Sequence, residues 1–242
     1  LLDNSRVTNG GKRPDRLAAD KIKNALVGLG YNEAVTYSFC GRTLINKSRL
    51  DPQSDKTQYI TLKNPLGEEL SLMRTTLIPS LLEVAAANRS KHNDNFKLFE
   101  YAKVYLSDEE TLTKLPAERN TLALAICGYD FYTLKSDISE ALWATGGIEF
   151  PRSDESVLHP GISADICVKG EKIGFLGQIH PKIAQNFSVE NVCVAEIDFD
   201  AAMRLMKTEI KFSPIPKFPA IARDFALVVD DKVMVRDIIS II

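Results

Sequence analysis

The sequence predicts an α+β fold in which an antiparallel sheet is flanked by helices. Its hydrophobic period switches between two and 3.6 residues, without the strict strand–helix alternation that is typical of a parallel sheet. Two strand-like stretches, 162–168 and 173–179, are joined by the short polar segment 169–172, which favours a β-hairpin. In mid-chain, the helix-forming stretch 74–89 precedes 96–105, a run rich in aromatic and β-branched residues that predicts a long strand.

The first part of the chain predicts two helices and two strands. Pro14 begins the first helix, because its missing N–H would have no partner in a first turn, and Gly30 ends it. Residues 32–40 alternate between apolar and polar side chains and predict one half-buried strand. The apolar row of that strand consists of Val35, Tyr37 and Phe39. A short helix near 42–50 and a short strand at 59–62 follow.

The rest of the chain continues with the same two periods. The predicted helices lie at 77–89, 130–145 and 201–207, and the strands at 96–105, 121–127, 162–168, 173–179 and 192–199. Prolines at 214, 216 and 219 then mark a boundary, after which 223–230 predicts a strand and 234–242 the start of a helix. We therefore expect a linker or the tail of a preceding domain at 1–12, a main module at 13–213 and a truncated second domain at 214–242. Because the last predicted helix stops while still apolar, we expect a piece of a longer protein.

Composition narrows the functional classes. The chain has 242 residues, of which 45% are hydrophobic and 26% charged, and a net charge of −2, so contact with nucleic acid is expected to be local. No apolar run is long enough to cross a bilayer, and we expect no membrane partner. The sequence contains no HExxH, GxSxG, P-loop or GxGxxG motif. Its four cysteines lie far apart and predict buried small apolar residues in a reducing, cytoplasmic compartment rather than disulfides or a zinc site. They are Cys40, Cys127, Cys167 and Cys193.

Seven short motifs, in this order, resemble the C-terminal half of the β subunit of bacterial phenylalanyl-tRNA synthetase. They are Arg13-Pro14-Asp15, Asn64-Pro65-Leu66, Arg74-Thr75-Thr76-Leu77-Ile78-Pro79-Ser80-Leu81-Leu82, Phe99-Glu100, His159-Pro160-Gly161, Leu176-Gly177-Gln178-Ile179-His180-Pro181 and Phe218-Pro219-Ala220-Ile221-Ala222-Arg223-Asp224. Each motif alone is weak, but seven in the same order make coincidence improbable. The resemblance covers nearly the whole chain.

The resemblance implies a role within a larger enzyme. That family forms an α2β2 tetramer that attaches phenylalanine to its tRNA with ATP and magnesium, and its α subunit holds the active site. Its β subunit contains a module with the class II catalytic fold but without the activity, followed by a ferredoxin-like anticodon-binding domain. The resemblance thus implies a degenerate class II module, then the truncated start of a ferredoxin-like domain. The implied partners are the α subunit and tRNA(Phe), with possible self-association of this chain alone. Its editing activity would lie elsewhere in the full β subunit.

The motifs of catalysis are missing from the matching positions. A class II synthetase needs an arginine on its long central strand for the α-phosphate of ATP, and residues 100–107 contain none; Lys103 supplies only a point charge. The junction expected to carry paired glycines and an arginine carries Glu196, Asp198 and Asp200, which would repel a triphosphate. We therefore expect no catalytic, nucleotide-binding or metal-binding residue and no cofactor in this chain.

Arg74 and Glu100 are candidate structural or interface residues. Arg74 would contact tRNA or the partner subunit, or else cap or salt-bridge the central helix; we favour a structural role. Glu100 lies in the predicted buried row of its strand and needs a partner there. The alternatives are an ion pair between subunits and one within the domain, with Arg74 or Arg89 as its partner. We favour the pair within the domain.

Four other candidate residues have a structural interpretation and a functional alternative. His159 and His180, each followed by proline, predict turns at strand ends, with a shared metal site as the alternative. Phe131 and Trp143 are expected in the core rather than as a platform for bases, although the aromatic stretch 129–132 would suit an interface.

Three basic residues in the last segment are the candidates for tRNA contact, with ordinary solvated charge as the alternative. They are Lys217, Arg223 and Lys232. Two further functions remain as alternatives to the scaffold: a stand-alone nucleic-acid-binding module, and an ATP-dependent ligase with an unconventional site. An arginine and backbone N–H groups converging on an open cleft in the sheet would favour the ligase. For docking of the α subunit, we expect a large apolar patch on the helices that flank the sheet.

Overall fold

The computed structural model describes residues 10–107, 114–206, 212, 214–219, 221–230, 233, 235–239 and 241. Its contacts divide the chain into two units, Leu1–Thr208 and Glu209–Ile242. The boundary expected at Pro214 lies a few residues after this division. Within the described residues, no helix has the length and apolar character needed to cross a membrane.

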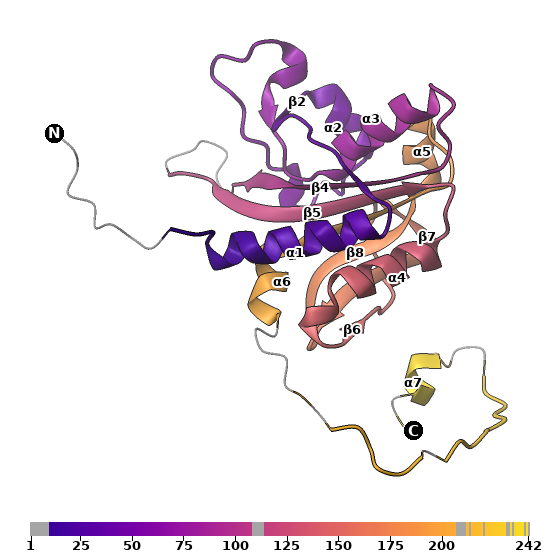
Figure 1. Ribbon diagram of the computed structural model, residues 1–242. Helices are drawn as coiled ribbons and strands as arrows, with labels where there is room; N and C mark the ends of the chain where they lie inside the picture. The colour runs from indigo at the N-terminus through magenta and orange to yellow at the C-terminus, as the bar shows by residue number, and fades with distance from the viewer. Residues whose placement is uncertain are drawn as a thin grey trace. The chain divides into compact units, whose positions relative to one another are not determined.

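The first unit is built on a seven-stranded sheet of order β1-β4-β5-β9-β8-β7-β6 (Figure 1). Its strands are β1 (Asn32–Glu33), β4 (Phe96–Leu106), β5 (Ala117–Cys127), β6 (Ile148–Glu149), β7 (Leu158–Val168), β8 (Glu171–Ile179) and β9 (Val192–Asp198). The β1–β4 pair is parallel, and the other five pairs are antiparallel. The predicted antiparallel-rich α+β class is therefore confirmed. A small second sheet pairs β2 (Phe39–Cys40) with β3 (Leu72–Met73).

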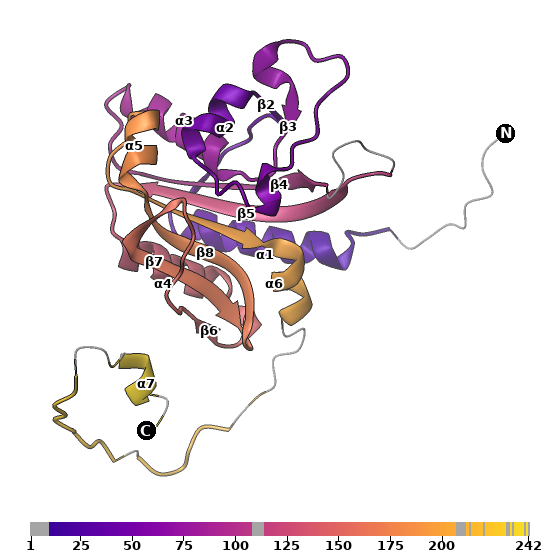
Figure 2. The same ribbon diagram turned by 180° about the vertical axis from the view of Figure 1, so that it is seen from behind.

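Helices cover both faces of the sheet (Figure 2). One face packs against α1 (Pro14–Gly28), α4 (Phe131–Ala141) and α6 (Phe199–Leu205). The other packs against α3 (Ile78–Arg89) and α5 (Pro181–Phe187), which α2 (Arg42–Ser48) contacts. Short 3-10 helices lie at η1 (Asp55–Thr57), η2 (Glu68–Leu70) and η3 (Trp143–Thr145).

Strand β5 shows why two cores form. Its leucine and isoleucine row, Leu122, Leu124 and Ile126, lies in the core beneath α1 and α4. Its small row, Ala123, Ala125 and Cys127, lies in the core beneath α3. Successive side chains of a strand point to opposite faces, so one strand contributes to both cores, and the small row leaves room for α3. Close packing continues at Gly174 of β8, where a Cβ atom would lie 2.3 Å from the carbonyl oxygen of Glu196.

Most predicted elements are present, and four predictions need correction. Residues 32–40 form two short strands, β1 and β2, separated by irregular backbone. The strand predicted at 59–62 is reduced to one bridge between Thr61 and Leu72. The predicted turn at His159 lies inside β7, at a register shift between Leu158 and Ser163. Proline lacks a donor for the ladder, so Pro160 is accommodated at that irregularity.

The fourth correction concerns the second unit. Residues 223–230 were predicted as a strand, but they have no regular secondary structure and are exposed. They have no paired strand in the described part of this unit, and an unpaired strand is not stable alone. The predicted final helix is present as α7 (Val235–Ile239).

Candidate functional site

A buried ion pair fixes the segment that follows β1. The Arg74 Nη1 atom lies 2.9 Å from Oε1 of Glu100 on β4, and the two side chains are 4% and 2% exposed. Arg74 also donates to the Thr36 hydroxyl at 2.9 Å and to the Tyr37 carbonyl at 3.3 Å. The Thr36 hydroxyl donates to Glu100 at 2.7 Å. The structure thus pairs Arg74 with Glu100 inside the domain, and both side chains also hydrogen-bond to Thr36.

This network decides which side of the segment faces outward. The Arg74 backbone N–H donates to the Ser38 carbonyl at 3.0 Å, and the Thr36 backbone N–H donates to Glu100 at 3.2 Å. The polar row is held inward, so the apolar row is turned out. Val35 is 89% exposed, Tyr37 75% and Phe39 37%. The expectation of a half-buried strand was therefore wrong, because the buried guanidinium captures the polar side.

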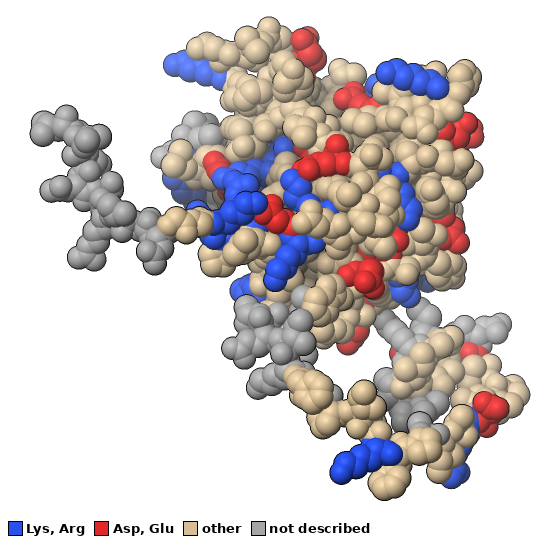
Figure 3. All heavy atoms as spheres, in the orientation of Figure 1, with Lys and Arg blue, Asp and Glu red and all other residues tan. Residues whose placement is uncertain are grey.

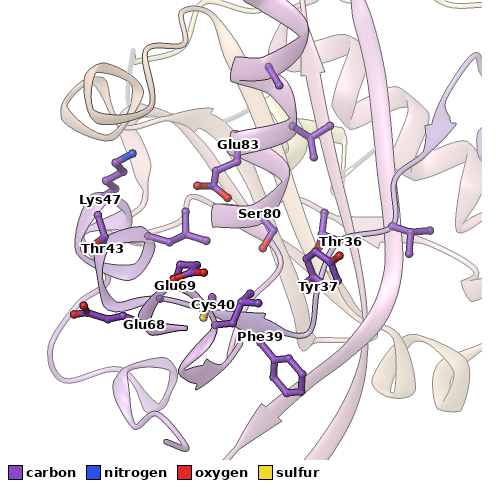
Figure 4. A pocket seen from close by; sticks show the side chains of 16 residues that line it. Thr36, Tyr37, Phe39, Cys40, Thr43, Lys47, Glu68, Glu69, Ser80 and Glu83 are labelled. Atoms are coloured by element: carbon purple, nitrogen blue, oxygen red, sulfur yellow. The ribbon is translucent and has the colours of Figure 1, made fainter. Parts of the chain in front are cut away.

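The exposed row borders a groove of about 1040 Å³ (Figure 4). Its walls come from residues 35–41, from α2, from η2 and from α3. Its described lining residues are Val35, Thr36, Tyr37, Phe39, Cys40, Gly41, Thr43, Leu44, Lys47, Glu68, Glu69, Leu70, Ser80, Glu83, Val84 and Ala87. Tyr37 and Phe39 lie at one side of the groove, and Lys47 and Thr43 of α2 lie at another (Figure 4).

Charge in the groove is mainly negative. Glu68 and Glu69 of η2 and Glu83 of α3 line it together with one cation, Lys47. All three carboxylates are exposed, and none forms an ion pair within the described residues. The Cys40 thiol lies at the inner wall, where burial raises its pKa to about 11 although the Arg74 charge acts in the opposite direction. That thiol is neutral at pH 7, and the net negative charge of the groove comes from its three glutamates and one lysine.

A second buried polar cluster lies on the α3 side of the sheet. The Glu196 carboxylate on β9 accepts from the Thr76 hydroxyl and, at 2.9 Å, from the Leu77 backbone N–H just before α3. Lys56 lies 2.6 Å from the other carboxylate oxygen and 4.8 Å from the Phe175 ring centroid. The free N–H groups at a helix N-terminus favour an anion, and here the chain supplies its own.

The other two acids of the β9–α6 junction also have partners. Asp198 caps α6 by accepting from the Ala201 N–H at 2.9 Å. Asp200 accepts from the Asn120 backbone at 3.0 Å and from its side-chain amide at 2.8 Å. In this structure these carboxylates stabilise the sheet and its helices.

Arginine lines two of the described pockets, and in both it is hydrogen-bonded within the chain. Arg74 lines a space of only about 10 Å³, no larger than one water site. The described lining of the large groove contains no arginine. Arg89 lines a shallower space of about 530 Å³, but it donates to the Glu190 carbonyl at 2.7 Å.

The other predicted residues lie apart from the groove. Phe131 packs against the core beneath α4, 5.5 Å from the Tyr132 ring. Trp143 lies in η3 and is 59% exposed, so its expected place in the core was wrong. His159 accepts from the Gly161 N–H at 3.0 Å, and His180 caps α5 by accepting from the Lys182 N–H at 3.1 Å. Each imidazole thus serves its own local turn.

The tRNA-contact candidates lie in the second unit. Lys217 and Arg223 are exposed, and Lys232 lies outside the described residues. In the first unit, Lys and Arg side chains gather over the N-terminal part of α1 with acidic side chains among them (Figure 3). Lys12 pairs there with Asp20, and Arg13 pairs with Asp15 at 2.9 Å. This basic surface is therefore partly neutralised.

Comparison with solved structures identifies the class of fold. Pyrrolysyl-tRNA synthetase from Desulfitobacterium hafniense superposes with a TM-score of 0.65 at 14% identity, covering 79% of this chain and 69% of that protein. The first unit therefore has the fold of a class II aminoacyl-tRNA synthetase module.

Sequence comparison identifies the family. Residues 2–199 match the model of the phenylalanyl tRNA synthetase beta chain CLM domain. The phenylalanine–tRNA ligase beta subunit of Clostridium tetani is 38% identical over 99% of this chain, and that of Bacillus subtilis is 31% identical over 97%. The chain belongs to the phenylalanyl-tRNA synthetase beta chain CLM domain family. It spans 31% and 30% of the length of those two relatives.

Sequence reasoning missed the residues that make the groove. No role was assigned from the sequence to Glu68, Glu69 or Glu83. The signal in the sequence was the alternation of apolar side chains with Thr36 and Ser38 in residues 32–40. If the polar side chains face the interior, they need buried polar partners. Sequence reasoning had named those partners, Arg74 and Glu100, without connecting them to residues 32–40.

Proposed function

We propose that this chain is the non-catalytic, catalytic-like module of a phenylalanine–tRNA ligase β subunit. In this role it binds the α subunit of an α2β2 enzyme in the cytoplasm and helps to position tRNA(Phe). ATP and magnesium are then bound elsewhere in the enzyme, during formation of phenylalanyl-tRNA. The names of the relatives, which are beta subunits, support a companion subunit.

One observation carries the scaffold role: the polar groups of the sheet that would suit a nucleotide are already used by the chain itself. Glu196 accepts from the Leu77 N–H just before α3, where a phosphate would otherwise be favoured, and Lys56 neutralises this carboxylate at 2.6 Å. Arg74 is committed to Glu100 at 2.9 Å in a closed space. A triphosphate would have to displace one carboxylate and separate a buried ion pair, and removing one partner of such a pair costs about 3–5 kcal/mol.

Nucleotide exchange and assembly test this proposal together. We expect the chain to show no phenylalanine-dependent ATP–pyrophosphate exchange, with the intact α–β enzyme as the positive control. We expect the purified β subunit to co-elute with the α subunit on a sizing column. Exchange activity in the chain alone, reduced by Lys56→Met, would favour the ligase alternative. Failure of the β subunit to bind the α subunit would contradict the scaffold.

The nucleic-acid-binding alternative is supported by the basic side chains over α1. Their pairing with Asp15 and Asp20 weakens it, because paired cations release fewer counterions from a phosphate backbone. Titration of unfractionated tRNA onto the chain at moderate salt distinguishes the two. We expect weak binding, and affinity at about the micromolar level or tighter would favour the alternative.

A further inference from the structure

The row of apolar side chains beside the groove is exposed to solvent instead of being buried in the core. Val35, Tyr37 and Phe39 lie within five residues and are exposed together. Other exposed apolar side chains of this unit, for example Leu17 of α1 and Trp143 of η3, lie on other elements. Contiguous exposed apolar surface bordered by polar groups is typical of a protein-binding site, whereas single exposed residues are ordinary.

The row is also held in a fixed position. Thr36 and Ser38, which alternate with the apolar residues, are hydrogen-bonded to Arg74 and Glu100 beneath them. The segment cannot rotate its apolar side inward without breaking the hydrogen bonds that Thr36 and the Tyr37 carbonyl make to this buried pair. A surface that is already ordered loses little conformational freedom when it binds.

The charge of the groove selects the kind of partner. Glu68, Glu69 and Glu83 line it with one opposing cation, Lys47. These charges are exposed at its walls, and the aromatic residues stand at its side, as the polar rim and apolar anchors of a protein interface do. An acidic rim is complementary to Lys and Arg side chains and repels phosphate.

We infer that this groove is the docking site for a polypeptide segment of the companion subunit, one that carries basic side chains beside apolar ones. The apolar side chains of that segment pack on Tyr37 and Phe39, and its basic side chains pair with Glu68, Glu69 and Glu83. This inference rests on the proposed scaffold function, since it names the surface through which the scaffold binds.

Two variants of the full-length β subunit test it, each with a matched control. Tyr37→Ala removes an exposed aromatic from the groove, and Leu66→Ala removes a 93% exposed side chain outside it. Glu83→Lys reverses a charge in the groove, and Glu140→Lys makes the same change at an exposed position of α4. The dissociation constant for the α subunit is measured by sedimentation at two salt concentrations.

We expect each groove variant to raise the dissociation constant by about tenfold or more, and each control to leave it unchanged. Glu83→Lys should also reduce the salt dependence of binding, because the lost contact is electrostatic. Circular dichroism of the free β subunit checks that both groove variants remain folded, and Glu69→Lys replaces any variant that does not.

Three other outcomes would overturn the inference. If both groove variants bind the α subunit as the unchanged β subunit does, the groove is not the docking site and the scaffold function stands. If the unchanged β subunit does not bind the α subunit, the scaffold function itself fails. If the groove variants lower the stability of the free β subunit or its self-association instead, the occupant is another segment of the β subunit or a second copy.

Discussion

Two stretches of this chain both predict a strand but adopt different structures. Residues 32–40 alternate apolar and polar side chains, whereas residues 192–198 are apolar except for Glu196 and Asp198. The second forms β9, whose residues from Val192 to Ile197 are all buried. The first forms two short strands with irregular backbone between them, and its apolar row faces outward.

The difference lies in what surrounds each stretch. β9 pairs with β5 on one edge and β8 on the other, and helices cover both faces of the sheet. Both of its rows are therefore buried, and Glu196 receives Lys56 and Thr76 as partners. Residues 34–39 have buried partners only for their polar row, namely Arg74 and Glu100. Alternation thus predicts a period, whereas the buried charges decide which row faces inward.

Removing the Glu100 carboxylate should have the largest effect on this comparison. Glu100→Ala leaves Arg74 buried without its partner, and we expect the free energy of unfolding to fall by about 3–5 kcal/mol. Backbone N–H groups of residues 34–39 should exchange faster, while those of β9 keep their relative protection. Urea denaturation and hydrogen exchange measure the two effects. Glu140→Ala on exposed α4 is the control; a loss no larger than that of the control would mean that the pair does not hold the segment.

Placing a hydroxyl in β9 should have the next largest effect. Val194 is fully buried in the core beneath α3, so Val194→Thr puts a hydroxyl of similar size where water cannot reach it. We expect a loss of about 1–3 kcal/mol in the free energy of unfolding. Thermal and urea unfolding give the value. An unchanged stability would imply that the hydroxyl finds a partner that the packing of β9 does not provide.

The two stretches also show what the sequence could and could not predict. The sheet class, the presence of flanking helices and an ion pair of Glu100 within the domain followed from local periodicity and from the need to pair buried charge, with Arg74 and Arg89 as alternative partners. The facing of residues 34–39 did not follow, because it depends on a contact between Thr36 and residues 38 and 64 positions further along the chain. Trp143 was misplaced for a related reason: an apolar side chain is not required to be buried.

Each stretch contains one buried cysteine, Cys40 or Cys193, whose thiol should make the stability of the protein depend on pH. Burial raises the pKa of Cys40 and of Cys193 from 9.0 to about 11. Between these two pKa values the thiol is ionised in the unfolded chain but protonated in the folded chain. The contribution of the thiol to the free energy of unfolding is therefore fully present below pH 9 and is lost as pH rises from 9 to 11. At pH 10 we expect each thiol to have lowered the free energy of unfolding by about 1.4 kcal/mol relative to pH 7.

Single variants separate the two thiols. Cys40→Ala and Cys193→Ala should each reduce the fall in stability between pH 9 and 11 by a similar amount, measured by urea unfolding at several pH values. Tyrosines that ionise in the same range contribute equally to all the proteins compared. If Cys40→Ala left the pH dependence unchanged while Cys193→Ala reduced it, the inward row of residues 34–40 would be wetter than the interior of β9.

Repeating the valine substitution in the exposed row should have the smallest effect. Val35 is 89% exposed, so the Val35→Thr hydroxyl is already in water, and we expect a change within about 0.5 kcal/mol in the free energy of unfolding. The chemical change is the same as in Val194→Thr, so the difference between the two variants measures facing alone. A loss for Val35→Thr close to that of Val194→Thr would mean that the apolar row is covered in the free protein. Such a result would remove the reason for treating that row as a surface kept open for a partner.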